Sequence, residues 1–174
     1  MSESLIIYSS TDGHTKTICL EILNSLKSKD LVEIISLEKV ETFDLNKYEK
    51  IIIGASIRYG RHNKKVLDFI IKNKNILDLK KTAFFSVNVV ARKEEKSTPE
   101  TNPYVLSFLK KTNWKPNKLS VFAGKVDYPN YNFINKIVIR FIMMITKGPT
   151  DINNSYEFTN WENVRKFAKE LEKL

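Results

Sequence analysis

The sequence predicts an α/β fold in which five parallel strands form one sheet, in the order 2-1-3-4-5, between two layers of helices. Short apolar runs alternate along the chain with segments of helical period, and this alternation is typical of right-handed βαβ units. The chain has 174 residues, of which 42% are hydrophobic and 28% charged, as in a globular protein. We therefore expect a single domain over residues 1–174.

The strands are expected at residues 5–8, 32–37, 51–55, 82–87 and 119–123, and the helices at 15–27, 64–73, 104–111 and 161–174. The third strand is a continuous apolar run, which is typical of a strand that is buried on both faces. In such sheets ligands bind beyond the carboxyl ends of the strands, where the strand order reverses. We therefore expect the functional site in the loops that follow the first, third and fourth strands.

Composition restricts the compartment and the partners. Cys19 is the single cysteine, so no internal disulfide is possible, and a reducing, cytoplasmic compartment is expected. No apolar run is long enough to cross a bilayer. Lys and Arg outnumber Asp and Glu by 29 to 20, which gives a net charge of +9. This surplus favours nucleic acid, an anionic membrane or an acidic ligand, or it reflects a lysine-rich proteome.

The loop after the first strand has the composition of a phosphate site. Gly13 lets the backbone approach a ligand, and the free N–H groups of the following helix point into the loop. Neither the three glycines of a dinucleotide fingerprint nor the lysine of a Walker loop is present, which favours a mononucleotide. The alternative is an ordinary helix cap. The hydroxyl groups of this loop belong to Ser9, Ser10, Thr11 and Thr15.

Two further side chains of this loop carry charge. The Asp12 carboxylate would repel a phosphate, so we expect it to cap the helix or to turn outward. His14 either lends a positive charge to the phosphate or is an exposed loop residue.

Two other loops are expected on the same rim of the sheet. After the third strand, Tyr59 is a candidate for contact with a ring, and Arg58 or Arg61 for contact with an anionic group. The alternative is that Arg58, Arg61 and His62 are solvated loop charges. The loop after the fourth strand begins with apolar and amide residues that suit contacts to a ring edge and ends in charged residues. The candidate residues are Ser56, Ile57, Arg58, Tyr59 and Gly60, then Ser86, Val87, Asn88, Val89, Val90, Ala91 and Arg92.

An insertion at about 125–155, near the fifth strand, exceeds what the minimal fold needs. Within it, residues 132–147 are expected to form a helix in which Lys136, Arg140 and Lys147 make one narrow stripe on an otherwise apolar surface. Such a helix suits the interface of an anionic membrane, the wall of an apolar pocket or a dimer contact. Plain core packing is the alternative.

Several segments resemble the bacterial menaquinone-dependent protoporphyrinogen IX dehydrogenases, which have a flavodoxin-like three-layer sandwich. Ordinary flavodoxins usually carry threonine at the position of Asp12 and are strongly acidic, and this chain differs from them in both respects. The segments that carry the resemblance are 9–15, 54–60, 86–93, 98–102, 128–131 and 159–161.

The resemblance implies an FMN enzyme of haem biosynthesis. It would oxidise protoporphyrinogen IX to protoporphyrin IX and pass the electrons to menaquinone or another membrane quinone. Residues 9–15, including Asp12, Gly13 and His14, would hold the FMN phosphate, and residues 56–60 and 86–92 would border the ring. Arg58, Arg61, Arg92 or Lys93 would be available to the substrate propionates. The location implied is the cytoplasmic face of the membrane.

Two other functions remain open on the sequence: a flavodoxin-type electron carrier, and another FMN-dependent quinone reductase with a nicotinamide donor. No nucleic-acid partner is expected, and the oligomeric state is not indicated. The two histidines, His14 and His62, have no carboxylate partner visible in the sequence, and no residues have metal-ligand spacing. No catalytic acid or base is therefore assigned, because the redox chemistry of such a protein belongs mainly to the flavin.

Overall fold

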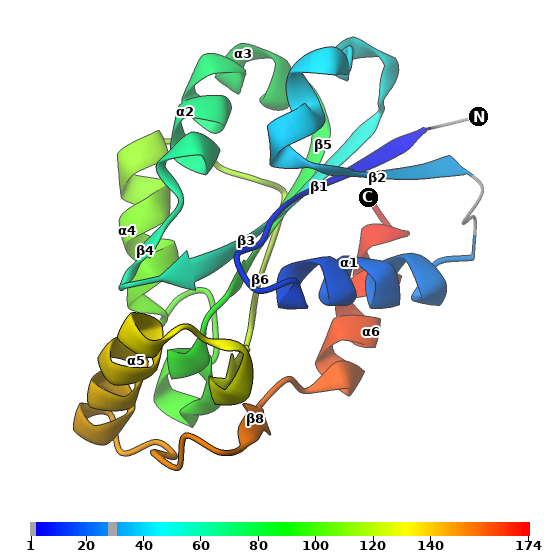
Figure 1. Cartoon of the computed structure of the whole chain (residues 1–174). Helices are drawn as coiled ribbons and strands as arrows, with labels where there is room; N and C mark the ends of the chain where they lie inside the picture. The colour runs from blue at the N-terminus through cyan, green and yellow to red at the C-terminus, as the bar shows by residue number, and fades with distance from the viewer. Residues whose placement is uncertain (1–2, 28–30) are drawn as a thin grey trace.

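Five parallel strands form the centre of the molecule. The computed structural model describes residues 3–27 and 31–174, and its parallel strands run in the order β2-β1-β3-β5-β6 (Figure 1). This arrangement confirms the expected flavodoxin-like order. The strands are β1 (Ser4–Ser9), β2 (Val32–Ser36), β3 (Lys50–Arg58), β5 (Lys81–Val87) and β6 (Lys118–Phe122).

Alternation along the strands divides the core into two layers. Successive side chains of a strand point to opposite faces, so Ile51 and Ile53 enter one apolar cluster and Ile52 enters the other. Gly54 of β3 is required at its position, because a Cβ there would overlap the Phe85 ring of β5. Both faces of β3 are therefore buried, as expected from its apolar run.

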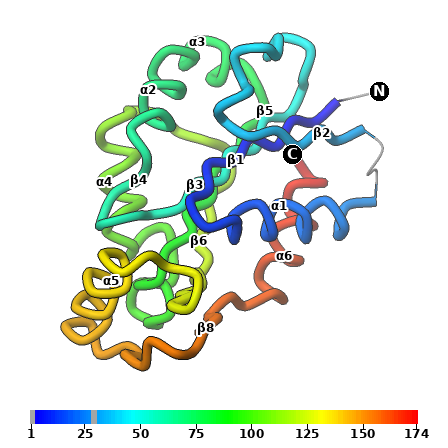
Figure 2. The backbone as a smooth tube through the Cα atoms, in the orientation of Figure 1, coloured from blue at the N-terminus to red at the C-terminus, as the bar shows by residue number. Residues whose placement is uncertain are grey.

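Helices cover both faces, as Figure 2 shows along the chain. The face that includes Ile51 is covered by α2, α3 and α4, whose apolar residues share its cluster. The opposite face is covered by α1 and α6, which pack beside each other. The helices are α1 (His14–Ser25), α2 (Lys64–Lys72), α3 (Lys74–Leu77), α4 (Pro103–Thr112) and α6 (Trp161–Leu171).

The third strand is longer than the sequence indicates. β3 continues to Arg58 and turns back through Tyr59 and Gly60 into β4 (Arg61–His62), which adds a sixth, antiparallel strand to the sheet. Tyr59 and Gly60 both have positive φ, at 50° and 77°, as the two central residues of a type I′ hairpin turn do. The expectation of a loop directly after residue 55 was therefore wrong, because the polar residues that end the apolar run are paired across a hairpin.

The insertion follows β6 and contains the expected helix, α5 (Phe133–Ile145). Its base is a two-stranded antiparallel ribbon of β7 (Lys125–Asp127) and β8 (Ser155–Glu157), which the sequence did not indicate because each strand has three residues. The helix ends earlier than expected, because Lys147 adopts a φ of 56° and the Gly148 N–H donates to the Met143 carbonyl at 2.7 Å. Among the described residues, no helix has the length and apolar character needed to cross a membrane.

Candidate functional site

A cavity of about 240 Å³ lies at the carboxyl ends of β1, β3 and β5. This is where the strand order reverses and where the sequence predicted the site. Segments from the insertion close another side of it. The lining residues are Ser10, Thr11, Asp12, Gly13, His14, Thr15, Thr17, Ser56, Ile57, Arg58, Val87, Asn88, Val89, Gly124, Lys125, Asp127 and Tyr131.

The loop before α1 and the first turn of α1 present unused hydrogen-bonding groups to this cavity. Ser10 Oγ and Thr15 Oγ1 are shielded from solvent and have no hydrogen-bond partner among the described residues. The residue that precedes the helix is Gly13, with a φ of 83°, and no side chain caps the first turn. Buried hydroxyls and helix N–H groups are costly when unpaired, so this loop fits an anion rich in oxygen atoms. The alternative of an ordinary helix cap does not hold here.

Asp12 neither caps the helix nor points away from the site. Its Oδ2 accepts a hydrogen bond from Arg58 Nη1 at 2.6 Å, which pairs the two charges within the cavity wall. The expected capping role was wrong, because the carboxylate is paired with an arginine at the end of β3 instead of with the helix N–H groups. Burial lowers the pKa of Arg58, but Asp12 and the tyrosines Tyr59 and Tyr131 outweigh it and leave that pKa raised.

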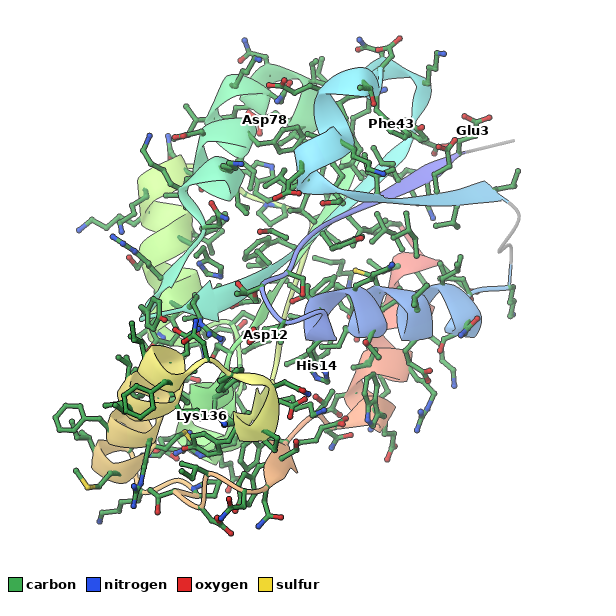
Figure 3. All side chains as sticks on the ribbon, viewed as in Figure 1. Glu3, Asp12, His14, Phe43, Asp78 and Lys136 are labelled. Carbon is green, nitrogen blue, oxygen red and sulfur yellow. The ribbon has the colours of Figure 1, made fainter. Side chains whose placement is uncertain are left out.

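His14 lies at the start of α1 (Figure 3). It is half-buried rather than exposed. Its Nε2 lies 2.6 Å from Thr159 Oγ1, and the Thr159 hydroxyl donates to the Ala123 carbonyl at 2.8 Å. The hydroxyl proton is thus already used, so His14 Nε2 is the donor in the first contact. Burial lowers the pKa of His14, with Lys125 adding to the effect and Glu157 opposing it. The imidazole is therefore neutral near neutral pH and supplies no full positive charge.

A buried polar network supports the loop after β5. His62 Nε2 lies 3.0 Å from Ser86 Oγ, and Asn88 Nδ2 donates to the same oxygen at 3.1 Å. Asn88 Oδ1 accepts from the Ala91 N–H and from Asn102 Nδ2, both at 3.1 Å. Asn88 thus fixes the start of the loop that borders the cavity. The interpretation of His62 as a solvated charge was wrong, because it is only 6% exposed.

Some candidate residues stand beside the cavity rather than on its wall. Arg92 donates to the Thr146 carbonyl at 2.8 Å and so holds the carboxyl end of α5. The Tyr59 hydroxyl donates to Asn135 Oδ1 in the first turn of α5. Arg61 and Lys93 are also absent from the lining, and Arg61 is exposed. The candidate residues outside the lining are Ser9, Tyr59, Gly60, Ser86, Val90, Ala91 and Arg92.

Five lining residues were missed by the sequence analysis: Thr17, Gly124, Lys125, Asp127 and Tyr131. Four of them lie at the base of the insertion, where short strands give no periodic signal. Asp127 accepts hydrogen bonds from Ser155, Asn130 and Lys125, and these lower its pKa to about 2. The 128–131 segment, noted for its family resemblance, was the one available signal for Tyr131.

The chemistry available in the described part of the chain is limited. No cluster of three or more potential metal ligands occurs there. Cys19 is buried among apolar residues, and that burial raises the pKa of its thiol. What the cavity offers is hydroxyl and N–H donors at one end and apolar and amide groups at the other.

Comparisons with known proteins agree with this geometry. Residues 5–153 match the flavodoxin domain family. The protoporphyrinogen IX dehydrogenase (quinone) of Leishmania major is 40% identical over 172 residues, which cover 98% of this chain and 74% of that protein. The chain belongs to the protoporphyrinogen IX dehydrogenase (quinone) family. The enzyme of the same name from Escherichia coli K12 is 36% identical over 173 residues, 99% of this chain and 96% of its own.

Solved structures that are similar to this chain support its fold. Oxidised Flavodoxin 2 from Bacillus cereus is 20% identical, with a TM-score of 0.56 and 99% of both chains covered. Flavodoxin 1 of the same organism is 17% identical, with a TM-score of 0.55, and covers 99% of this chain and 98% of its own. At these identities the likeness concerns the fold alone.

The buried histidine predicts a specific pH dependence of stability. Burial, with a smaller contribution from Lys111, lowers the pKa of His62 to about 4, whereas an unfolded histidine titrates near 6.5. Between these two pH values, His62 is protonated in the unfolded state and neutral in the folded state. Stability is therefore complete above about pH 6.5 and falls as the pH approaches 4. The loss is on the order of 3 kcal/mol.

His62→Gln should flatten this acid limb, as measured by urea unfolding at several pH values from neutral to acidic. His14→Gln is the matched control, because the pKa of this half-buried histidine is also lowered, and it should flatten the limb less. Parallel pH profiles for the wild type and His62→Gln would show that His62 titrates normally in the folded protein.

Proposed function

We propose that this protein oxidises protoporphyrinogen IX to protoporphyrin IX with bound FMN and passes the electrons to a quinone. The observation that carries the proposal is the pair of unpartnered buried hydroxyls at the uncapped start of α1, in a chain whose relatives are named protoporphyrinogen IX dehydrogenase (quinone). We further propose that residues 1–174 form one flavodoxin-like domain carrying the insertion at 125–155.

The residues present fit FMN. Four residues offer hydroxyl or backbone groups to a phosphate: Ser10, Thr11 and Gly13 of the loop before α1 and Thr15 of its first turn. Ser56, Ile57 and Arg58 on one side and Val87, Asn88 and Val89 on the other would border the ring. We assign a supporting role to the candidate residues outside the lining, which fix these segments: Ser9, Tyr59, Gly60, Ser86, Val90, Ala91 and Arg92.

The bound FMN would supply the redox chemistry by taking up electrons from the substrate and releasing them to the acceptor. The chain contributes position and electrostatics. Neutral His14 holds the phosphate loop against Thr159, which follows the insertion, and the Asp12–Arg58 pair holds it against the end of β3. Asn88 fixes the loop after β5 through its amide contacts. We assign no side chain as proton acceptor, because the second histidine, His62, is buried behind the cavity wall.

An electron carrier is the alternative from a different functional class. Carriers of this fold need a surface for a protein partner, but they do not need an insertion that lines the flavin cavity. Here Lys125, Asp127 and Tyr131 of the insertion contribute to the lining. This contribution favours an enzyme with its own substrate.

The function is tested with FMN-loaded protein mixed anaerobically with protoporphyrinogen IX and menaquinone. We expect porphyrin fluorescence to rise only when the quinone is present. We propose menaquinone as the acceptor, so a ubiquinone analogue serves as the comparison. Flavin-loaded protein that gives no quinone-dependent fluorescence contradicts the dehydrogenase. Reduction of the same flavin by a nicotinamide donor would then support the quinone reductase.

The unpartnered hydroxyls predict opposite effects on binding and on stability. The double variant Ser10→Ala, Thr15→Val removes two buried hydroxyls that lack partners in the chain, so the apoprotein should be as stable as the wild type or more so. FMN should bind at least roughly a hundredfold more weakly, because each of the two lost hydrogen bonds to a charged group contributes about 1.5–3 kcal/mol.

Flavin fluorescence titration and urea unfolding measure the two effects. Riboflavin, which lacks the phosphate, is the matched control ligand, and its affinity should change little. Equal losses for FMN and riboflavin would place the phosphate elsewhere.

We also propose that α5 lies on an anionic membrane surface, at the cytoplasmic face where a quinone is accessible. Phe133, Ile137, Phe141 and Met144 follow one another at helical spacing and are 54–76% exposed. Met143 is the one residue of α5 that is buried. Helical geometry puts Lys136 and Arg140 between the buried side and this apolar face. An exposed apolar face bordered by cations fits the interface of an anionic bilayer.

Vesicle flotation tests the membrane proposal. The variant in which Lys136, Arg140 and Lys147 are all changed to Gln should float much less with vesicles that contain anionic lipid. The matched control changes three exposed lysines of α2, Lys64, Lys65 and Lys72, to Gln, and should float like the wild type because α2 lies far from α5 (Figure 1). Equal flotation of the two triple variants contradicts a specific role for the α5 cations.

A further inference from the structure

Arg58 is held in the cavity wall by its neighbour Tyr59 and by two segments that are distant in the sequence. Its side chain is 19% exposed and is paired with Asp12 of the loop before α1. The guanidinium carbon lies 5.0 Å from the ring centroid of Tyr131, in the insertion, and 5.3 Å from that of Tyr59, in the hairpin turn. Both distances are within the range of cation–π contacts. The guanidinium is therefore fixed in position, unlike an ordinary surface arginine.

The charged groups on the cavity wall form two ion pairs. Arg58 pairs with Asp12, and Lys125 pairs with Asp127 at 3.0 Å. The Asp127 carboxylate is also held by Ser155 and Asn130 and so belongs to the base of the insertion. A flavin nucleotide brings a negative phosphate, and reduction of the ring adds further negative charge. The negative charge of Asp12 alone would repel both the phosphate and the reduced ring. The positive charge of its partner Arg58 therefore decides how strongly the reduced flavin is bound.

We infer that Arg58 is the cation that stabilises the reduced flavin in this cavity, and that Asp12 and Tyr131 are the positioning residues that hold it there. The inference rests on the proposed function in that it takes FMN as the bound nucleotide. Arginine suits the role because its charge does not depend on pH in the working range and its planar group stacks on aromatic rings. Its low exposure limits screening by water and salt.

The hairpin offers a matched control for this charge. Arg61 is directly opposite Arg58 in the β3–β4 pair, so the two arginines flank the same two-residue turn. Arg61 is exposed and does not line the cavity. Changing either arginine to Gln removes one positive charge from the same hairpin, but only Arg58→Gln alters a residue that lines the cavity.

The test is the two-electron midpoint potential of the FMN-loaded protein, measured by spectroelectrochemistry at fixed ionic strength without porphyrinogen or quinone. Arg58→Gln should weaken binding of the reduced flavin about tenfold relative to the oxidised flavin. This is a fall of about 30 mV in the potential. Arg61→Gln should leave the potential at the wild-type value. Arg58→Lys keeps the charge and should recover most of the fall, which separates loss of charge from damage to the fold.

Asp12→Asn gives a shift of opposite sign. The amide oxygen still accepts the hydrogen bond from Arg58 but no longer offsets its charge, so the potential should rise above that of the wild type. Structural damage at the cavity would not raise the potential with one variant and lower it with its partner.

A potential that is the same in Arg58→Gln and Arg61→Gln overturns the inference, as does a fall with Asp12→Asn. The proposed function fails separately: protein that takes up FMN and shows the expected shifts, but does not oxidise protoporphyrinogen, removes the dehydrogenase and leaves the role of Arg58. Protein that takes up no FMN removes both.

Discussion

The uncapped start of α1 is the constraint on which the rest of the site depends. The loop before it leaves the first helix N–H groups without a side-chain partner, and two buried hydroxyls are unpaired beside them. Unpaired buried polar groups cost free energy in the isolated chain, and a bound FMN phosphate, as proposed, would supply their missing partners. Gly13 makes the turn possible at a φ of 83°, and a Cβ there would meet no atom within 4 Å. The backbone conformation, rather than crowding, therefore accounts for the glycine.

The insertion is part of the cavity and is not an appendage to the fold. Its base is closed by Thr159, which connects the Ala123 carbonyl to His14. Tyr131 packs on Arg58, and Arg92 holds the carboxyl end of α5. These contacts involve each of the three loops at the carboxyl edge of the sheet. These contacts therefore connect the insertion that carries α5 to the segments that line the cavity.

The predictable parts of this structure are those specified by local pattern. The apolar run at Ile51–Ile53 predicted a strand buried on both faces, and the hydroxyls around Gly13 marked a loop that lines the cavity. Long-range pairings escaped because neither partner alone carries a signal. The sequence predicted a capping or outward-facing Asp12, because its partner Arg58 follows forty-six positions later in the chain. The sequence left His62 as a solvated charge, but Ser86, Phe84 and Phe108, all distant in the sequence, pack against it and bury it.

The exposed apolar surface of α5 costs free energy in water, so it calls for a partner surface that covers it. Seven apolar side chains of this helix are exposed: Phe133, Ile134, Ile137, Phe141, Ile142, Met144 and Ile145. Full burial of one such side chain is worth about 1.5–3 kcal/mol, so an unpartnered face of this size favours association or aggregation. Lys136 and Arg140 beside it disfavour packing against a second copy of the same helix, because like charges would meet. The same cations favour a surface that is both apolar and anionic, and a quinone acceptor would be found beneath such a surface.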